Sequence, residues 1–387
     1  MAGNGRTDWL RQSYLFYTQL SAGSLLVLPS IMLPIYFKIA AYLEGYLFFF
    51  EFFGMLIGSL LLPGASDKIG RRPALAVAIM LYSVGSFLPY LNHSFYPLIA
   101  SMIIMGTGIG ANVPIVNAMM NEFSDQKERG TIMSIGNAIF NLGFIIIPLF
   151  LLFGAARFIF AYGLIQLISI IPLISVPEIT KLNGGGGFNQ LYKSSYLKRT
   201  LLVSFATFFV FFSVYGIIDW FPTLIYNGII EVPAFFQKDY IIIANLGAFS
   251  GAALMAPFIE KLGRKLLGVL VDLIAGITEM LVGLISGNAI LLIAALIFAS
   301  LLFMEGALAI VTIVSSELYG SEMRGRGLGN SLAWGRIAGM ISPLVLGSIL
   351  EDLKSPALPF LVISISSLAA MSCFLMLPET RYITSHR

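Results

Sequence analysis

The chain has 387 residues, of which 58% are hydrophobic and 11% are charged. Because soluble proteins carry about 25% charged residues, this composition excludes an ordinary soluble protein and predicts a protein embedded in a lipid bilayer. The formal net charge of +3 comes mainly from short segments between apolar runs, so it gives no sign of nucleic acid binding.

Apolar runs recur along the whole chain. A helix needs about 20 apolar residues to cross about 30 Å of hydrocarbon. Because backbone polar groups inside lipid must be paired, and no run alternates as barrel strands do, we expect helices. The twelve expected spans are residues 14–37, 45–62, 73–91, 96–119, 131–153, 157–176, 200–229, 239–258, 266–286, 288–314, 328–350 and 357–377.

Three short charged motifs occur twice, about half a chain length apart. A duplication in the same order predicts a repeated structural unit. The pairs are PGASDKIGRR at 63–72 with APFIEKLGRK at 256–265, EFSDQKERG at 122–130 with ELYGSEMRG at 317–325, and the Pro-Glu dipeptides at 177–178 and 378–379.

The duplication divides the chain into two six-helix bundles, residues 1–176 and 200–387, joined by a linker at 177–199. The glycine run between Asn183 and Phe188 indicates flexibility. Because each half contains an even number of spans, we expect parallel repeats related by an axis along the membrane normal. The expected fold is an all-α membrane protein with 12 transmembrane helices, whose central cavity opens alternately to either face.

Lysine and arginine predict the orientation. With the N-terminus inside, 18 of the 23 basic residues lie in inner loops or at the termini. Because inner loops of membrane proteins are enriched in these residues, both termini are expected to be cytoplasmic. The lack of long loops favours a plasma membrane.

The repeated charged motifs predict a cytoplasmic gate. A carboxylate at the end of a span can cap a neighbouring helix and pair with an arginine, and contacts made in one state bias a two-state equilibrium. The alternative is a positively charged anchor without a role in transport. The expected gate residues are Asp67, Arg71, Arg72, Glu122, Arg129, Glu178, Glu260, Arg264, Glu317, Arg324 and Glu379.

These motifs resemble those of the major facilitator superfamily. The Glu-x6-Arg-Gly and Pro-Glu elements resemble its sugar porters, whereas 106–114 and 334–343 resemble its organic-ion carriers and metabolite-proton symporters. The sequence departs from the family at Pro63 and Ala256, where glycine is usual, which weakens the helix-packing part of the loop motif. The resemblance implies secondary transport by alternating access.

Charged residues within spans are the best indicators of a site, because one charge at the bilayer centre costs roughly 3 kcal/mol. Arg336 lies in a span where, by resemblance, an arginine faces the cavity. Its guanidinium suits a carboxylate, which it can bind through two hydrogen bonds. The alternative is a structural ion pair with Glu305 or Asp219.

Asp219 is the first candidate for carrying a proton. Gly216 and Pro222 flank it and predict a broken helix of the kind that lines transporter sites. Desolvation would allow such a carboxyl to hold a proton near neutral pH. Glu305 and Glu51 are the other candidates, whereas Asp272 and Glu279, two turns apart in one span, are expected to be structural.

Amides and aromatic side chains provide the expected lining of the cavity. Each is equally explained by a hydrogen bond or packing contact between helices. The candidates are Gln19, Asn112, Asn137, Asn141, Gln166, Asn245, Asn330, Tyr215, Trp220 and Trp334. Sugar porters usually carry a carboxylate in the first span, an arginine at the start of the fourth and a double glutamine in the seventh; none is present, which argues against a typical hexose carrier.

The expected function is secondary active transport of a small organic metabolite, preferably a carboxylate moved with protons. A sugar or polyol carrier is the alternative, and a receptor built on a carrier fold is the alternative from another class. The sequence has no nucleotide-binding loop and no metal-ligand spacing, so we expect no enzyme activity, cofactor or metal. The expected state is a monomer in the bilayer.

Overall fold

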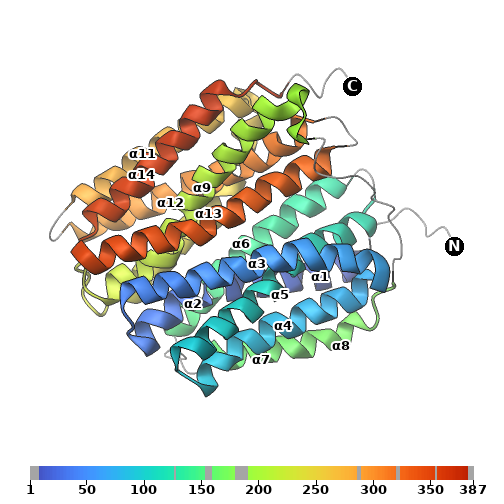
Figure 1. Cartoon of the computed structure of the whole chain (residues 1–387), viewed down its shortest axis with the longest axis horizontal. Coiled ribbons are helices and arrows are strands. Elements are labelled where there is room, and N and C mark those ends of the chain that lie inside the picture. The colour runs from blue at the N-terminus through green and yellow to red at the C-terminus, as the bar shows by residue number, and fades with distance from the viewer. Residues whose placement is uncertain are drawn as a thin grey trace. The chain divides into compact units, whose positions relative to one another are not determined.

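The structure is a computed structural model that describes residues 8–125, 128–152, 159–178, 191–285, 289–319, 323–353 and 355–381. The side chains of Asp67 and Glu260, two expected gate residues, lie outside this description, as does most of the linker, at 179–190. The described residues are almost all helical (Figure 1).

The helices follow the expected order. Those that precede the linker are α1 (Trp9–Leu26), α2 (Leu28–Met32), the π-helix η1 (Leu33–Phe37), α3 (Ala41–Ile69), α4 (Arg71–Leu91), α5 (Phe95–Glu122), α6 (Arg129–Leu152), α7 (Ile159–Ile165), the 3₁₀ helix η3 (Gln166–Ser169) and α8 (Ile170–Leu173). Those that follow it are α9 (Ser194–Tyr226), α10 (Gln237–Leu262), α11 (Arg264–Leu284), α12 (Ile290–Glu317), α13 (Arg324–Leu353) and α14 (Ala357–Met376).

Eleven helices in the described ranges are long and apolar enough to cross a membrane. A shorter apolar helix, Ala161–Leu173, lies within the expected sixth span. The predicted helical membrane fold is therefore confirmed.

The chain forms two compact units. The first contains Met1–Met32 and Tyr46–Asn183, and the second contains Leu33–Gly45 and Gly184–Arg387. The segment Leu33–Gly45 is tied into the second unit by hydrogen bonds: the Thr223 hydroxyl donates to Glu44 at 2.9 Å, and the Ala41 backbone N–H donates to Glu351 at 3.0 Å.

Equivalent helices pack together within each unit. The first and fifth spans pair as α1 with α6 and as α9 with α13, and the third and sixth pair as α4 with α7 and as α11 with α14. The third and fourth spans also pair in both units, as α4 with α5 and as α11 with α12. The duplicated motifs therefore correspond to a duplicated pattern of helix packing.

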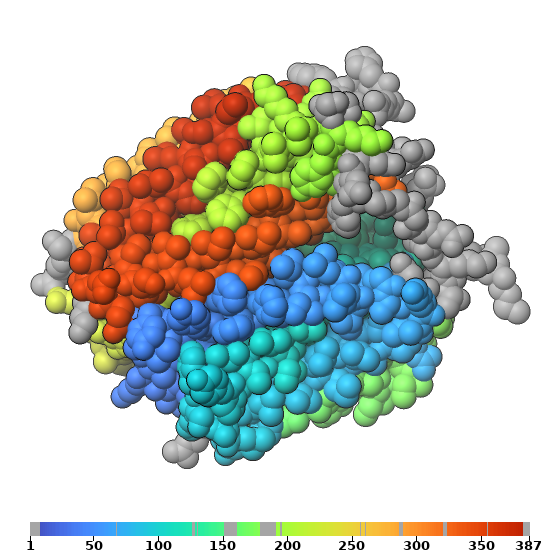
Figure 2. Space-filling model, viewed as in Figure 1, coloured from blue at the N-terminus to red at the C-terminus, as the bar shows by residue number. Residues whose placement is uncertain are grey.

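Helix α5 approaches α3 so closely that glycine is required at their contact. A Cβ atom on Gly106 would overlap the carbonyl oxygen of Glu51, and one on Gly110 would overlap that of Met55. Figure 2 shows the surfaces of these two helices, blue and teal, in direct contact. Small residues at such positions let helices pack closely inside lipid.

The predicted break in the seventh span is wrong. Helix α9 runs from Ser194 to Tyr226 with Gly216 and Pro222 inside it. Gly216 instead provides space, because a Cβ there would lie 3.0 Å from a Leu346 methyl group and 3.1 Å from Ile363. Irregular helix occurs in other spans, as the π-helix η1 and the 3₁₀ helix η3.

Substitution of Gly110 by alanine is expected to lower stability by about 2 kcal/mol, because the added methyl group forces α5 and α3 apart. Thermal unfolding of the purified protein in detergent measures the loss. Gly64→Ala is the matched control in α3, because a Cβ there meets nothing within 4 Å. Equal unfolding temperatures for both variants would contradict the close-packing interpretation.

Candidate functional site

The first repeated motif forms a compact polar network at the start of α4. Gly70 adopts a φ of 98°, which lets the chain turn between α3 and α4. The Glu178 carboxylate accepts a hydrogen bond from the backbone N–H of Arg71 at 2.7 Å and a longer one from Arg72 at 3.5 Å. It therefore caps α4 at the end where N–H groups lack partners within the helix.

The side chain of Arg71 completes this α4 network. Its Nε donates to Glu122 Oε1 at 2.8 Å, and both side chains are largely shielded from water, with 9% and 17% of their surfaces exposed. The α4 network thus joins the third span, the end of the fourth and the chain after the sixth.

The second unit contains the same arrangement at the start of α11. Gly263 has a φ of 84°, and Glu379 accepts hydrogen bonds from the backbone N–H groups of Arg264 and Lys265, both at 3.0 Å. Arg264 binds Glu317 through two hydrogen bonds of 3.2 and 3.1 Å. The duplication therefore extends to individual side-chain contacts.

Glu379 is held in its ionised form by this α11 network. Burial by itself raises the pKa of its carboxyl group, but N–H donors from Arg381, Lys265 and Arg264 outweigh burial and hold the pKa below its usual value. Thr380, the next residue, donates its hydroxyl to Glu317. Sequence analysis missed this threonine, although its place directly after the Pro-Glu dipeptide was a signal.

Two expected gate residues lie apart from these networks. Arg129 begins α6 and Arg324 begins α13, and both are exposed. Within the described ranges, neither guanidinium makes a hydrogen bond or ion pair. Their role in a gate stays a prediction.

Three interior charged residues of the second unit surround Tyr215. Arg336 on α13 donates to the Tyr215 hydroxyl on α9 at 3.3 Å. Asp219, one turn further along α9, and Glu305 on α12 interact electrostatically with the same tyrosine, and they are 3% and 2% exposed. This Arg336 cluster, formed by Tyr215, Asp219, Glu305 and Arg336, presents acidic and basic groups from three neighbouring helices.

Asp219 has an oxygen available within the Arg336 cluster. Among the described residues, its Oδ2 atom is buried without a hydrogen-bond partner. A buried polar atom without a partner is costly. The Arg336 cluster can therefore gain a hydrogen bond when a ligand or proton arrives.

The aromatic candidates have different surroundings. Trp220 is almost fully buried, at 1% exposed, and its ring fills the space beside Gly347. Trp334 is half-buried and packs against Phe205, with ring centroids 5.6 Å apart. Of these two side chains, Trp334 is thus the one that keeps part of its surface exposed.

Asn330 and Asn245 already use their amide N–H groups. Asn330 donates to Ser204 at 2.9 Å and accepts from Tyr192 at 2.6 Å, so it joins α13 to α9 and to the chain before α9. Asn245 donates to the Ile241 carbonyl within its own helix, and its oxygen is without a partner in the described part of the chain.

The first unit brings several predicted amides together. Gln19 on α1 donates to Asn117 at 3.0 Å and accepts from Asn112 at 3.3 Å, both on α5. Glu51 is buried in α3, Asn141 is half-buried in α6, and Asn137 is exposed.

A second polar group in the first unit joins α1 to the sixth span. Gln166 accepts from the hydroxyls of Tyr17 and Ser21, both at 2.7 Å, and Ser24 and Tyr162 lie 2.8 Å apart. Sequence analysis singled out Gln166 but missed its hydroxyl partners, because serine and tyrosine in apolar spans gave no distinctive pattern.

Asp272 and Glu279 are both completely buried in α11. Glu279 accepts hydrogen bonds from Ser300 at 3.2 Å and Ser367 at 2.6 Å, which join α11 to α12 and α14. In the described ranges, both oxygens of Asp272 lack a hydrogen-bond partner.

Two family models together match almost the whole chain. The model described as Major Facilitator Superfamily matches residues 13–240, and the model described as Sugar (and other) transporter matches residues 177–386. The chain belongs to the Major Facilitator Superfamily.

Curated superfamily relatives match most of this chain. The putative niacin/nicotinamide transporter NiaP of Bacillus subtilis is 24% identical over 338 residues, covering 84% of this chain and 83% of its own length. The gentisate transporter of Corynebacterium glutamicum is 26% identical over 356 residues, covering 86% and 79%.

The fold is also similar to a solved structure, the inward open conformation of the xylose transporter XylE from E. coli. The two share 17% identity with a TM-score of 0.77, covering 96% of this chain and 97% of the other. As a superfamily member, this chain is a multi-pass membrane transporter of small molecules and not an enzyme, as predicted.

Substitution of Glu379 by glutamine is expected to cost about 1 kcal/mol of stability at neutral pH, as loss of a helix cap does. The unfolded chain has the higher carboxyl pKa, so ionised Glu379 stabilises the fold above that value. As pH falls from about 4.3 through the lower folded pKa, the difference between wild type and Glu379→Gln should disappear.

Thermal unfolding measured across this pH range checks the prediction. Glu231→Gln is the control, because Glu231 is exposed in a loop. A difference that persists or grows at the lowest pH would contradict the expected sign.

Proposed function

We propose that this superfamily member is a symporter that moves a small aromatic carboxylate together with protons. The Arg336 cluster carries the proposal, because Arg336 is bonded to Tyr215 beside two buried carboxyl groups. A guanidinium binds a carboxylate through two parallel hydrogen bonds, which gives both affinity and orientation. The Tyr215 hydroxyl supplies a further polar contact to the same anion.

The relatives support this class of substrate. Niacin, which one name gives together with the amide nicotinamide, and gentisate, which the other gives, are both carboxylic acids on a six-membered aromatic ring. Phe211, one turn before Tyr215 on α9, packs against that tyrosine with ring centroids 5.6 Å apart. Trp334, two residues before Arg336, instead extends from another side of α13 and packs against Phe205. An aromatic side chain beside Tyr215 can pack against such a ring.

Asp219 and Glu305 are proposed to carry the coupled proton, with Glu51 as the candidate in the first half. Without substrate, the positive charge of Arg336 favours the ionised forms of Asp219 and Glu305. A bound anion would partly neutralise that charge. Their proton uptake then becomes easier when substrate is bound, which links the two ligands. The remaining proposed binding residues are Gln19, Asn112, Asn141, Trp220, Asn245 and Asn330.

Transport is proposed to proceed by movement of the halves 1–176 and 200–387, joined by the linker 177–199. The α4 and α11 networks would act as gate elements on the cytoplasmic side. We propose that both termini lie on this side too, because inner loops are enriched in lysine and arginine. We further propose a monomer in the plasma membrane.

Arg336→Lys is expected to weaken binding of aromatic carboxylates at least about tenfold, because lysine cannot form the two parallel hydrogen bonds. Binding of nicotinate and gentisate to purified protein, measured by calorimetry, gives the change. Arg326→Lys at the start of the same helix is the control. Unchanged affinity in Arg336→Lys would contradict the proposed substrate contact.

Asp219→Asn is expected to abolish substrate accumulation driven by a pH gradient while leaving exchange of labelled for unlabelled substrate in place. The reason is that asparagine cannot take up a proton, whereas exchange needs no net proton movement. Asp272→Asn, another buried aspartate in a span, should retain both activities. Loss of exchange together with accumulation would indicate a structural role instead.

A sugar or polyol is the second candidate substrate. The match of the Sugar (and other) transporter model to residues 177–386 favours it, as does the amide pair of Gln19 and Asn112. Competition assays separate the two candidates. If sugars displace a labelled substrate and carboxylates do not, the second candidate replaces the first.

A further inference from the structure

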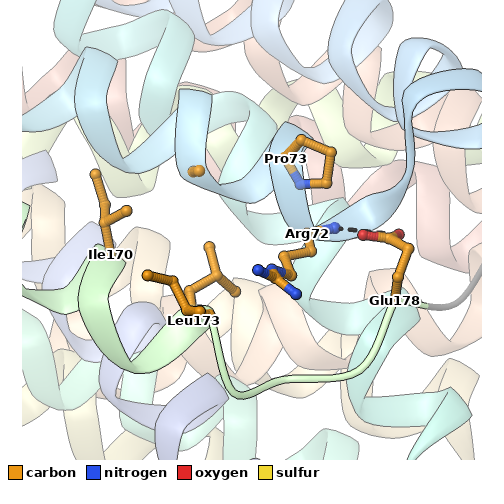
Figure 3. A pocket seen from close by; sticks show the side chains of 7 residues that line it. Arg72, Pro73, Ile170, Leu173 and Glu178 are labelled. Atoms are coloured by element: carbon orange, nitrogen blue, oxygen red, sulfur yellow. Dashed lines mark hydrogen bonds between the residues drawn. The ribbon is translucent and has the colours of Figure 1, made fainter.

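An open groove lies beside the α4 network and apart from the Arg336 cluster, between the start of α4 and the end of the sixth span. Its volume is about 350 Å³. One wall is formed by Arg72, Pro73 and Ala76, and the other by Ile170, Leu173 and Ile174, with Glu178 at one end (Figure 3). Most of these lining residues are apolar. We call it the Arg72 groove.

The groove continues onto an exposed apolar face. Ile168 is 62% exposed, and Ile171 and Ile174 are each 65% exposed. These residues belong to a span or its immediate end, so in a bilayer this surface contacts lipid rather than water. A ligand in the groove must therefore have an apolar part that contacts the wall and a charged part that contacts Arg72.

Arg72 supplies the charge. Its backbone N–H points toward Glu178, but in the described part of the chain its guanidinium makes no hydrogen bond or ion pair. The neighbouring Arg71, by contrast, is paired with Glu122. Figure 3 shows the Arg72 side chain extending into the groove, beside Leu173.

Glu178 is the acidic group in the groove lining, and one of its two carboxylate oxygens already accepts hydrogen bonds. Glu178 Oε1 accepts the backbone N–H groups of Arg71 and Arg72. Its negative charge is thus directed at the end of α4, where unpaired N–H groups carry partial positive charge. The guanidinium of Arg72 stays available for an external anion.

We propose that the Arg72 groove binds an anionic phospholipid. Its phosphate accepts hydrogen bonds from the Arg72 guanidinium, and an acyl chain lies along Ile170 and Ile174. Basic pockets between spans at the membrane surface bind acidic headgroups in this way. The apolar wall favours a lipid over free phosphate, which has no group to place against it.

The repeat provides a matched control. Lys265 occupies the equivalent position at the start of α11, and its backbone N–H likewise donates to a capping glutamate, Glu379. The twelfth span beside it is a continuous helix to Met376, in contrast to the 3₁₀ helix η3 that interrupts the sixth. Lysine is also a point charge that cannot make the two parallel hydrogen bonds of arginine.

The experiment measures lipid binding to the purified full-length protein by native mass spectrometry, with phosphatidylglycerol as probe and phosphatidylcholine as the zwitterionic comparison. Wild type should prefer phosphatidylglycerol, and Arg72→Gln should reduce that binding about fivefold. Lys265→Gln should leave it unchanged. Ile174→Glu, at an exposed position, should also reduce it by placing a negative charge beside the phosphate.

Three results would overturn the proposal. The first is equal phosphatidylglycerol binding by Arg72→Gln and wild type. The second is an equal loss in Lys265→Gln, which would indicate general attraction to a basic surface. The third is displacement by inorganic phosphate at concentrations similar to the lipid, which would indicate a phosphate site. Each outcome is independent of which substrate the protein transports.

Discussion

Each unit depends on a glutamate that caps the start of a helix distant from it in the sequence. Glu178 follows the sixth span and binds the first N–H groups of α4, the third span; Glu379 does the same for α11. A helix end next to an apolar region must have its N–H groups satisfied, because leaving them without partners costs free energy. The two glutamates satisfy this requirement and also join the last span of each half to its third.

The glycine before each capped helix is part of the same constraint. A Cβ atom on Gly70 would lie 2.5 Å from Glu178 Oε1, and one on Gly263 would lie 2.5 Å from Glu379 Oε2. Both glycines also adopt positive φ angles that other residues rarely take. The carboxylate can therefore reach the helix end only where no side chain intervenes.

The halves agree in these networks and differ in their interior polar groups. The second unit holds the Arg336 cluster, with buried acidic groups on α9 and α12. At the position equivalent to Arg336, which lies 195 residues earlier, the first unit has an amide, Asn141. Binding sites are set by a few side chains on a common fold. Two halves that share their helix-capping networks but differ in their interior polar groups can therefore bind different ligands.

The fold was predictable because span length and loop charge are strong signals in a membrane protein. The ion pairs of Arg71 and Arg264 with glutamates of the second motif were also predictable, because the charged motifs occur in the same order in both halves. The hydrogen-bond geometry was not, because backbone N–H groups and the hydroxyl of Thr380 leave little mark in a sequence. Pro222 misled the prediction for α9: without an N–H it cannot bond to the carbonyl of Ile218, one turn earlier, yet the helix continues to Tyr226.

The segment Leu33–Gly45 has a consequence for how the two units are connected. The chain enters the second unit at Leu33, returns to the first at Tyr46 and enters the second again at Gly184. The glycine run is therefore the third crossing, and the first two lie on either side of η1. A protein cut in the glycine run would still have a piece of its first fragment, held by Glu44, embedded in its second. The two fragments would thus carry a built-in recognition element for reassembly.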